Sequence, residues 1–486
     1  MDKSLISEYS TQVMLLNNKG VEFLGKRDLL GAFHHFLAAY TLDNTSVISL
    51  QNLSAIYLNT ERFSAARLLC LKALELEPDN KFVKFNLATA LLGMRLVKES
   101  LEVNKNNTSE METEASFLHN YGLALSLNEQ FNEALEMFNK SLELNPNSAS
   151  VHSDRGLTRL AVKDIQGGLE EYEIRWGSLF RGRTWEYVEN NNIPQWKGEN
   201  LAGKKILIHH EQGFGDTLML MRFITNLLVQ GAKVFIAVPV ALVRLVAKVY
   251  EHDNVIVFDW ESDQGNDPVK ELTYPSEVKG ADYHCPMLSL MRWLGVEVGT
   301  IPDNSYIKYE SSTRKTDKSN SKLKIGICWA SGDHGIALAR RRRIVPLDYF
   351  FPLLEIPEVE LISLQLGSGR ELLEAVSIQG LSPLIKDPMS MVADFLDTAN
   401  IIKDLDLVIS VDSAVVHLAG GMGKPVIMLG PNPRCWRWWG KTTGEPWYRN
   451  FKIFQQDQSG DWRNTMIEIV SHVKETYFAK DYSGAK

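Results

Sequence analysis

The chain has 486 residues, more than one hydrophobic core usually holds, so its length predicts two or three domains. Its 44% hydrophobic and 23% charged residues are typical of a globular protein and exclude a disordered or collagen-like chain. Its net charge of −8 has the wrong sign for a protein that binds nucleic acid by neutralising phosphates.

The cysteines and the apolar segments indicate a location for the protein. Its four cysteines lie far apart and form no C-x-x-C pair, which argues against a zinc site or a disulfide framework. The first ten residues contain no apolar signal segment, and the most apolar window, residues 234–243, is about half as long as a bilayer span. We therefore expect a cytoplasmic protein with no transmembrane segment.

The first third of the chain repeats with a period of 34 residues. The repeat units start at Val13, Val47, Lys81, Ala115 and Ala149. The eighth residue of each unit is small: Gly20, Ser54, Ala88, Gly122 and Gly156. The twentieth residue is also small, and the twenty-fourth is large in most units, so two helices can approach closely around one filling side chain. This pattern resembles the tetratricopeptide repeat, a stack of helix pairs that usually binds a peptide or protein, and we assign it to residues 1–180.

The third unit departs from the repeat pattern. Asn104, Asn107 and Glu112 stand where core or turn residues belong. We therefore expect the second helix of this unit to be distorted.

After residue 180, short β-branched runs alternate with amphipathic helical patterns, which is typical of parallel α/β structure. A polar stretch, residues 309–322, interrupts this series and predicts a linker between two domains, 181–312 and 313–486. The expected fold class is thus α + α/β, with two doubly wound domains after the repeats. Ligands of such sheets bind at the carboxyl ends of the strands, so the motifs that follow strands are candidate sites.

The first candidate motif, residues 209–216, lies between a predicted strand and a predicted helix. Its Glu211, Gln212, Gly213 and Gly215 suit a tight turn where a ligand could approach the backbone. Asp216 has a simpler explanation as the N-cap of a helix that begins at the next residue. The spacing alone favours the N-cap.

The second candidate motif, residues 411–421, also joins a strand to a helix. Asp412 at the strand tip suits a ribose hydroxyl, and Ser413 with the first helix amides suits a diphosphate. His417 lies on the same helix face one turn deeper, and Gly420 follows it. A histidine at this depth could equally be a core residue that packs against Leu429.

The third candidate motif follows the first strand of the second α/β domain. It comprises Trp329, Ser331 and Gly332, and Gln365 ends the next strand. The four arginines close behind them in the sequence are Arg340, Arg341, Arg342 and Arg343. A run of charges is usually a solvated surface, but its place after a strand favours a diphosphate that one or two of the arginines contact.

Two further motifs carry weaker signals. The tryptophan-rich segment 431–439, with Trp447 and Tyr448 downstream, predicts a loop over a site where aromatic faces stack on a sugar or base. Residues 404–406 spell the D-x-D of metal-dependent glycosyltransferases. Their place at the entry to a buried strand favours a structural turn, so we predict no metal site.

Together, five segments resemble glycosyltransferase family 9, and the resemblance covers nearly the whole chain. They are E-Q-G-F-G-D (211–216), H-C-P-M-L-S-L (284–290), the Trp329 loop, S-V-D-S-A-V-V-H-L-A-G (410–420) and P-W-Y (446–448). That family contains the lipopolysaccharide heptosyltransferases, and the chain looks most like bacterial members with N-terminal tetratricopeptide repeats. The resemblance implies a GT-B fold of two Rossmann-like domains, with the acceptor on 181–312 and the nucleotide-sugar on 313–486.

The resemblance also implies roles for individual residues. The aspartate of the G-x-G-D turn is the catalytic base in that family, which moves Asp216 from N-cap to base. Asp412, Ser413 and His417 match the residues that contact the nucleotide and its pyrophosphate. A basic residue after the first strand of the C-terminal domain meets the phosphates, and which arginine of 340–343 is equivalent stays open.

We therefore expect an inverting, metal-independent glycosyltransferase with an ADP-, UDP- or GDP-sugar as its donor and no other cofactor. The repeats would recruit the acceptor, such as a protein. One alternative is a lipopolysaccharide or other glycan acceptor, with the repeats as a docking or dimerisation arm of a homo-oligomer. A second alternative is a non-catalytic interaction protein, against which the intact Asp216, Asp412 and His417 speak.

Overall fold

The computed structural model describes residues 3–178, 183–259, 275–308, 322–332, 343–367, 369–373, 384–432, 434–439, 442–457 and 460–478. Within it the chain forms two compact units, Met1–Thr158 and Arg159–Lys486. Each unit is described by itself. No described helix is both long enough and apolar enough to cross a membrane.

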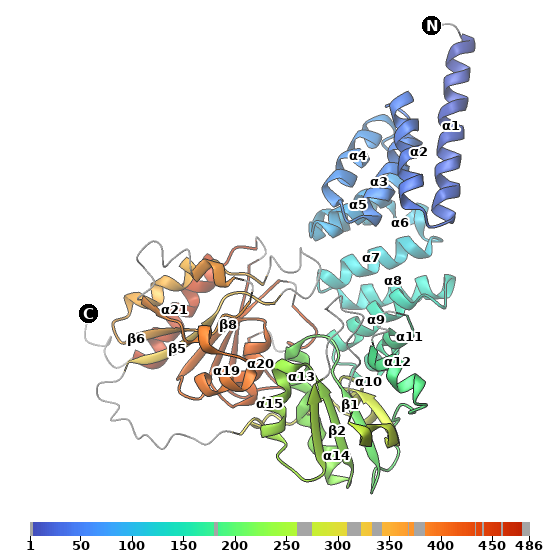
Figure 1. The fold of residues 1–486 in the computed structure, drawn as a ribbon. Helices are drawn as coiled ribbons and strands as arrows, with labels where there is room; N and C mark the ends of the chain where they lie inside the picture. The colour runs from blue at the N-terminus through green and yellow to red at the C-terminus, as the bar shows by residue number, and fades with distance from the viewer. Residues whose placement is uncertain are drawn as a thin grey trace. The chain divides into compact units, whose positions relative to one another are not determined.

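The first unit is a stack of antiparallel helix pairs (Figure 1). Its helices are α1 (Lys3–Gly25), α2 (Leu29–Leu42), α3 (Val47–Asn59), α4 (Phe63–Leu76), α5 (Lys81–Gly93), α6 (Val97–Met111), α7 (Ala115–Leu127) and α8 (Phe131–Leu144). The next helix, α9 (Ala149–Ala161), crosses into the second unit. The first helix of each pair after α1 begins where the 34-residue repeat begins in the sequence. This unit is the predicted tetratricopeptide-repeat superhelix.

The repeat pattern is explained by contacts inside each helix pair. A Cβ atom added to Gly20 would lie 2.3 Å from Phe36 Cε1, and one added to Gly122 would lie 2.7 Å from Phe138 Cε1. Both phenylalanines are fully buried. The small eighth residue and the large twenty-fourth residue of a repeat therefore touch, as the sequence pattern predicts.

The predicted distortion of the third repeat is wrong, because α6 is a regular α-helix over Val97–Met111. Asn107 Nδ2 donates a hydrogen bond to the carbonyl of Lys81 at 2.9 Å, and Ser100 Oγ donates to the carbonyl of Ala88 at 2.8 Å. These polar side chains bond to the first helix of the pair, so they replace apolar contacts without breaking the helix.

Each turn between the two helices of a repeat contains one residue in the left-handed region. These residues are Arg27, Glu61, Arg95, Glu129 and Lys163, with φ values between 56° and 73°. They recur at the same repeat position, and none is a glycine, although left-handed backbone costs other residues about 1–2 kcal/mol. Backbone hydrogen bonds hold the turn closed. After Glu61, for example, the amide of Arg62 donates to the carbonyl of Tyr57 at 2.8 Å.

The second unit contains two parallel sheets (Figure 1). The first has the order β3-β2-β1-β4, with β1 (Lys205–His209), β2 (Lys233–Val238), β3 (Val255–Asp259) and β4 (Tyr283–Pro286). The second has the order β10-β9-β8-β5-β6-β7, with β5 (Leu323–Cys328), β6 (Val359–Ser363), β7 (Ile385–Lys386), β8 (Leu407–Val411), β9 (Val426–Gly430) and β10 (Phe451–Gln455). Every paired strand runs parallel to its neighbour. The predicted parallel α/β structure is therefore present.

The helices of this unit lie before, between and after these strands. The α-helices are α10 (Ile165–Tyr172), α11 (Arg175–Ser178), α12 (Arg183–Asn190), α13 (Phe214–Leu220), α14 (Ile224–Val229), α15 (Val240–Val249), α16 (Ser289–Trp293), α19 (Phe395–Ile402), α20 (Ala414–Gly421) and α21 (Arg463–Phe478). The 3-10 helices are η1 (Met221–Phe223), η2 (Ser276–Gly280), η3 (Val298–Thr300), η4 (Leu347–Glu355) and η6 (Pro388–Met391).

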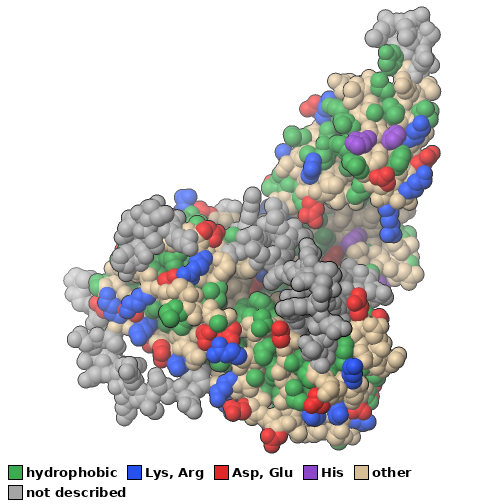
Figure 2. Space-filling view, viewed as in Figure 1, with side chains coloured by type: hydrophobic (Ala, Val, Ile, Leu, Met, Phe, Trp, Pro, Cys, Tyr) green, Lys and Arg blue, Asp and Glu red, His purple; other side chains and the backbone are tan. Residues whose placement is uncertain are grey.

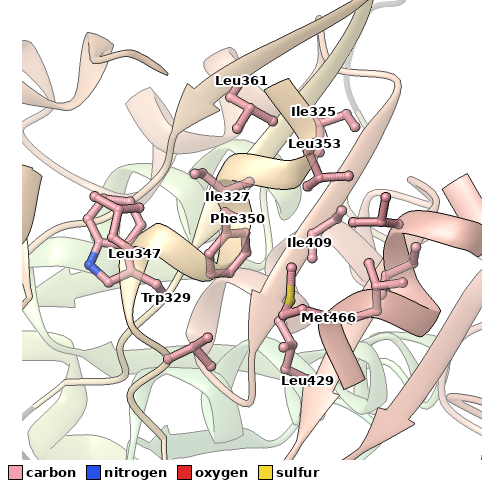
Figure 3. Close-up of a cluster of buried hydrophobic side chains, with 14 of the residues drawn as sticks. Ile325, Ile327, Trp329, Leu347, Phe350, Leu353, Leu361, Ile409, Leu429 and Met466 are labelled. Carbon is pink, nitrogen blue, oxygen red and sulfur yellow. The ribbon is translucent and has the colours of Figure 1, made fainter. Parts of the chain in front are cut away.

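The core of the second sheet explains why its strands are continuous apolar runs. Ile325, Ile327 and Ile409 from the strands pack with Phe350 of η4 and Met466 of α21 (Figure 3). Helices cover the sheet, so β8 and β9 are buried along their whole length.

We predict that Glu61→Gly stabilises the repeat unit by about 0.5–1 kcal/mol. Glycine removes the left-handed strain, and part of that gain is offset by the greater freedom of glycine in the unfolded chain. Hydrogen exchange of the α3 and α4 amides in the full chain would measure the change. Glu102→Gly, an exposed position inside α6, is the matched control and should destabilise its helix by about 0.5–1 kcal/mol. Equal destabilisation by both glycines would contradict the strain argument.

Candidate functional site

The candidate motifs meet at the carboxyl edges of the two sheets. Strand order reverses between β1 and β4 in one sheet and between β5 and β8 in the other, and ligands of parallel sheets bind at such points. Helix α13 follows β1, helix α20 follows β8, and the two helices lie side by side (Figure 1). A Cβ atom added to Gly215 would lie 2.7 Å from His417 Cδ2. Gly215 thus allows two helices to approach, where the sequence suggested the approach of a ligand.

Asp216 occupies the third position of α13, which begins at Phe214. Its Oδ2 accepts a hydrogen bond from the amide of Gly213 at 3.1 Å. The predicted N-cap at Asp216 is therefore wrong by three residues, because Gly213 is the N-cap. The carboxylate still caps the helix start, and its other oxygen, Oδ1, accepts a hydrogen bond from Arg437 Nη2.

Arg437, in the loop after β9, is the central cation of the site. Its Nη2 also donates to Gln212 Oε1 at 3.2 Å, and its guanidinium lies 4.8 Å from the centre of the Trp436 ring. Burial disfavours the charge of Arg437, but the carboxylates of Asp216 and Asp412 raise the pKa of its guanidinium. Arg437 therefore stays charged between two carboxylates from the two sheets.

His417 is 4% exposed and packs inside this cluster. Its ring stacks on Trp438, with centroids 5.3 Å apart, and its Nδ1 lies 3.0 Å from Tyr448 Oη. Burial lowers the pKa of His417 to about 3; Asp216 opposes the shift, whereas Arg437 adds to it. The imidazole is thus neutral, and its hydrogen-bond partner is Tyr448, whereas the core alternative placed it against Leu429.

Asp412 and Ser413 follow β8 directly. Asp412 is 8% exposed, and its negative charge acts on Arg437. Ser413 is the N-cap of α20, and its Oγ accepts a hydrogen bond from the amide of Val415 at 3.3 Å. The amino end of α20 thus faces the same edge of the sheet as Asp412.

Glu211 anchors the turn after β1. Its two carboxylate oxygens accept hydrogen bonds from Arg175 Nε at 2.9 Å and Nη2 at 3.1 Å, and Oε1 also accepts from the amide of Leu288 at 2.6 Å. Arg175 is fully buried between the rings of Tyr172 and Trp176. The structure thus uses Glu211 to hold the turn that the sequence predicts here.

Trp329 and Gln365 hold the loop after β5. The Trp329 ring is fully buried, close to Leu347 and Phe350 (Figure 3), and its Nε1 donates to the carbonyl of Gly369 at 2.9 Å. Gln365 Oε1 accepts from the amides of Trp329 and Ala330 at 3.1 and 2.9 Å. Both residues belong to the predicted donor-site motif, and in the structure their polar groups are bonded within the loop, which they stabilise.

The remainder of this loop reaches the site through Arg343. The amide of Ser331 donates to the carbonyl of Arg343 at 3.1 Å, and Gly332 follows Ser331 at the surface. The positive charge of Arg343 contributes to the low pKa of His417, which places it near the cluster. Residues 340–342, the other predicted phosphate contacts, lie outside the described residues.

The tryptophans of the loop after β9 are mostly core residues. Trp438 and Trp447 are 2% and 0% exposed, and Trp439 stacks on Trp447 with centroids 5.7 Å apart. Gly420 is a packing position, because an added Cβ would lie 2.7 Å from the Tyr448 ring. The prediction that these aromatic faces cover a ligand is therefore wrong for Trp438 and Trp447, whose faces contact other side chains.

Asp406 of the D-x-D segment lies far from this edge of the sheet. Its Oδ2 accepts a hydrogen bond from the amide of Lys324 at 2.9 Å, at the start of β5 and β8. This contact agrees with the predicted structural turn.

Sequence reasoning did not assign roles to Arg437, Arg175 or Arg222. Arg222 is buried under the rings of Tyr306 and Tyr448, and its Nη1 donates to the carbonyl of Trp447 at 2.9 Å. An arginine beside aromatic residues was the available signal for Arg437 and Arg175. Their partners are distant in the sequence.

The low pKa of His417 predicts a loss of stability in acid. Unfolded histidine has a pKa of about 6.5, so the unfolded chain binds one more proton below that pH, and stability falls as pH drops toward 3. This residue alone should cost about 2 kcal/mol between pH 7.5 and pH 5. All 11 tryptophans lie in the second unit, so urea unfolding followed by their fluorescence isolates it.

His417→Gln removes the titrating group and should make the pH dependence shallower by up to one proton. His252→Gln, at an exposed position of the same unit, controls for the loss of one imidazole. An unchanged slope in His417→Gln would show that the ring accepts a proton in the folded protein.

Comparisons with known proteins identify the repeats. Two tetratricopeptide-repeat family models match residues 48–80 and 115–148. Protein FlbA of Caulobacter vibrioides is 24% identical over 443 residues, which cover 82% of this chain and 73% of that protein.

Solved structures with similar helical regions include MamA (41-end) from Desulfovibrio magneticus RS-1, with 18% identity over 35% of this chain and 98% of that chain, and a TM-score of 0.30. YrrB, a TPR protein with an unusual peptide-binding site, has 18% identity over 38% of this chain and 96% of that chain, and a TM-score of 0.29. The family models show tetratricopeptide repeats in the chain, and the parallel sheets and helices of the structure follow them.

Proposed function

We propose that the protein is an inverting glycosyltransferase that moves a sugar from a nucleotide-sugar to an acceptor recruited by its repeats. The observation that carries this proposal is the meeting of Asp216, Arg437, Asp412 and His417 at the facing carboxyl edges of two parallel sheets. The resemblance of the motifs to glycosyltransferase family 9 supports the proposal, and with it a GT-B arrangement of two Rossmann-like domains.

In the proposed reaction Asp216 is the general base. The acceptor hydroxyl transfers its proton to the Asp216 carboxylate while its oxygen forms a bond to the anomeric carbon. The bond from that carbon to the diphosphate breaks, and the nucleoside diphosphate leaves with the electron pair. Attack and departure on opposite faces of the sugar invert the configuration.

The leaving diphosphate needs positive charge on the side of the second sheet. Arg437, Arg343 and the amino end of α20 at Ser413 are the groups of this chain that could supply it. Arg437 is paired with Asp216 in the structure, so a bound diphosphate would compete for its guanidinium. That competition would free Asp216 for the acceptor hydroxyl. Asp412 at the tip of β8 suits the ribose hydroxyls.

The repeats support a protein as the acceptor, because stacked tetratricopeptide repeats usually bind peptides or proteins. A glycan acceptor of the lipopolysaccharide type is the second candidate, and the resemblance to the heptosyltransferases favours it. Clusters of buried charged residues are typical of catalytic sites, so this cluster favours an enzyme over a purely non-catalytic interaction protein.

Asp216→Asn should reduce the transfer rate at least about 100-fold without weakening nucleoside diphosphate binding, because the neutral amide competes less for Arg437. The amide keeps an oxygen that accepts from Gly213 but cannot take the proton. Asp303→Asn is the matched control, because Asp303 is also paired with an arginine, Arg449, but is away from the cluster. Transfer above about a tenth of the wild-type rate in Asp216→Asn would refute the base assignment.

Arg343→Ala should weaken nucleoside diphosphate binding about 10-fold to 100-fold, since it removes a charge-assisted contact. A thermal-shift panel of ADP, UDP, GDP, CMP and dTDP first identifies the nucleotide that raises the melting temperature. Calorimetry of that nucleotide with Arg343→Ala then measures the loss, and the corresponding nucleoside should be unaffected. The exposed Arg463→Ala serves as control, and equal affinities in both variants would remove Arg343 from the phosphate site.

A further inference from the structure

The second helices of the first four repeats present one exposed row of side chains, the outer stripe, at repeat positions 18, 22, 25 and 29. In the first two repeats it consists of Leu30, His34, Leu37 and Thr41, then Ser64, Leu68, Leu71 and Glu75. In the next two it consists of Lys98, Glu102, Lys105 and Ser109, then Asn132, Glu136, Asn139 and Glu143. Equivalent positions on one scaffold thus change from apolar to charged along the stack.

The apolar half of the outer stripe is well exposed. Leu30 and Leu68 are each 65% exposed, although leucine side chains of soluble proteins are seldom clustered at the surface. The 14 residues of α2 include no Lys, Arg, Asp or Glu, whereas α4, α6 and α8 all carry charges. Figure 2 shows hydrophobic side chains on the N-terminal helices beside histidines.

Helices α2 and α4 contact each other. Lys72 Nζ of α4 donates to Tyr40 Oη of α2 at 3.0 Å, and Leu69 packs on the same buried cluster as Phe36. The exposed leucines of the two stripes therefore lie on neighbouring helices.

The amino end of the stack is also apolar. Leu15 of α1 is 52% exposed, whereas the equivalent Val83 and Phe117 are fully buried against the preceding repeat. One apolar position that later repeats bury is therefore exposed in the first repeat.

We propose that this face, formed by Leu30, Leu37, Leu68 and Leu71, is where two copies of the chain associate. A second copy presents the same leucines, so a twofold axis through the face brings apolar side chains onto apolar side chains.

The distribution of charge favours a second copy as the occupant. Residues 1–150 carry 13 basic and 18 acidic residues, a net charge of −5, so most faces of two copies repel each other. Residues 3–76, which contain α1 to α4, carry seven basic and six acidic residues, a net charge of +1. Two copies can therefore approach at these helices with little like-charge repulsion. The near-neutral surface would also attract a highly charged partner only weakly.

Sedimentation velocity of the full chain over a concentration series tests the proposal. The wild type should sediment as a dimer at about 20 μM, and Leu30→Lys/Leu68→Lys should raise the dimer dissociation constant at least about 100-fold. Asn132→Lys/Glu136→Lys places the same lysines at the same two repeat positions of α8 and should leave the dimer unchanged. Circular dichroism should give the same helix content for all three proteins, because the four positions are exposed.

Three results would overturn the proposal. The first is a wild type that is monomeric at about 100 μM, and the second is a leucine variant that dimerises as tightly as the wild type. Alternatively, a monomeric wild type would co-sediment with phosphatidylcholine vesicles and the leucine variant would not, which would make the face a membrane-binding surface.

Discussion

The ion pair between Arg437 and Asp216 connects the two sheets of the second unit. Arg437 lies in the loop after β9, and Asp216 lies in the first turn of α13, the helix that follows β1. Both side chains are about 15% exposed, so each charge is compensated mainly by the other. Gln212 bonds to the same guanidinium, and the charge of Asp412 also acts on it. The candidate site is therefore held together by the same groups that are proposed to carry its chemistry.

A second arginine, Arg175, is fully buried and holds the turn between β1 and α13 through Glu211. Arg175 bonds to Glu211, Glu173 and Ser289, and it lies between two aromatic rings. Glu211 in turn bonds to the amide of Leu288 after β4. The strands on both sides of the reversal in strand order, β1 and β4, are thus tied to α11. A turn that is held this firmly can present Asp216 in one orientation, which a general base requires.

The parts of the fold that depend on local sequence could be predicted. The helix pairs could be predicted because a small residue of the first helix and a large residue of the second recur every 34 residues and touch each other. The buried strands were apparent as short apolar runs. The site was less predictable. Asp216 and Arg437 are 221 residues apart, and no periodic pattern links them. Trp329 follows a strand that ends at the site edge, yet its ring turns into the core, and the sequence alone does not determine which way a side chain faces.

Gly215 has a consequence for how the second unit can vary. Its missing side chain leaves the space that the His417 ring occupies, so the spacing of α13 and α20 is set by one absent methyl group. A larger residue there would have to displace α20, and with it the end of β8 that carries Asp412. Substitutions in the two helices are therefore linked at this contact. A larger residue at position 215 requires a smaller one at position 417.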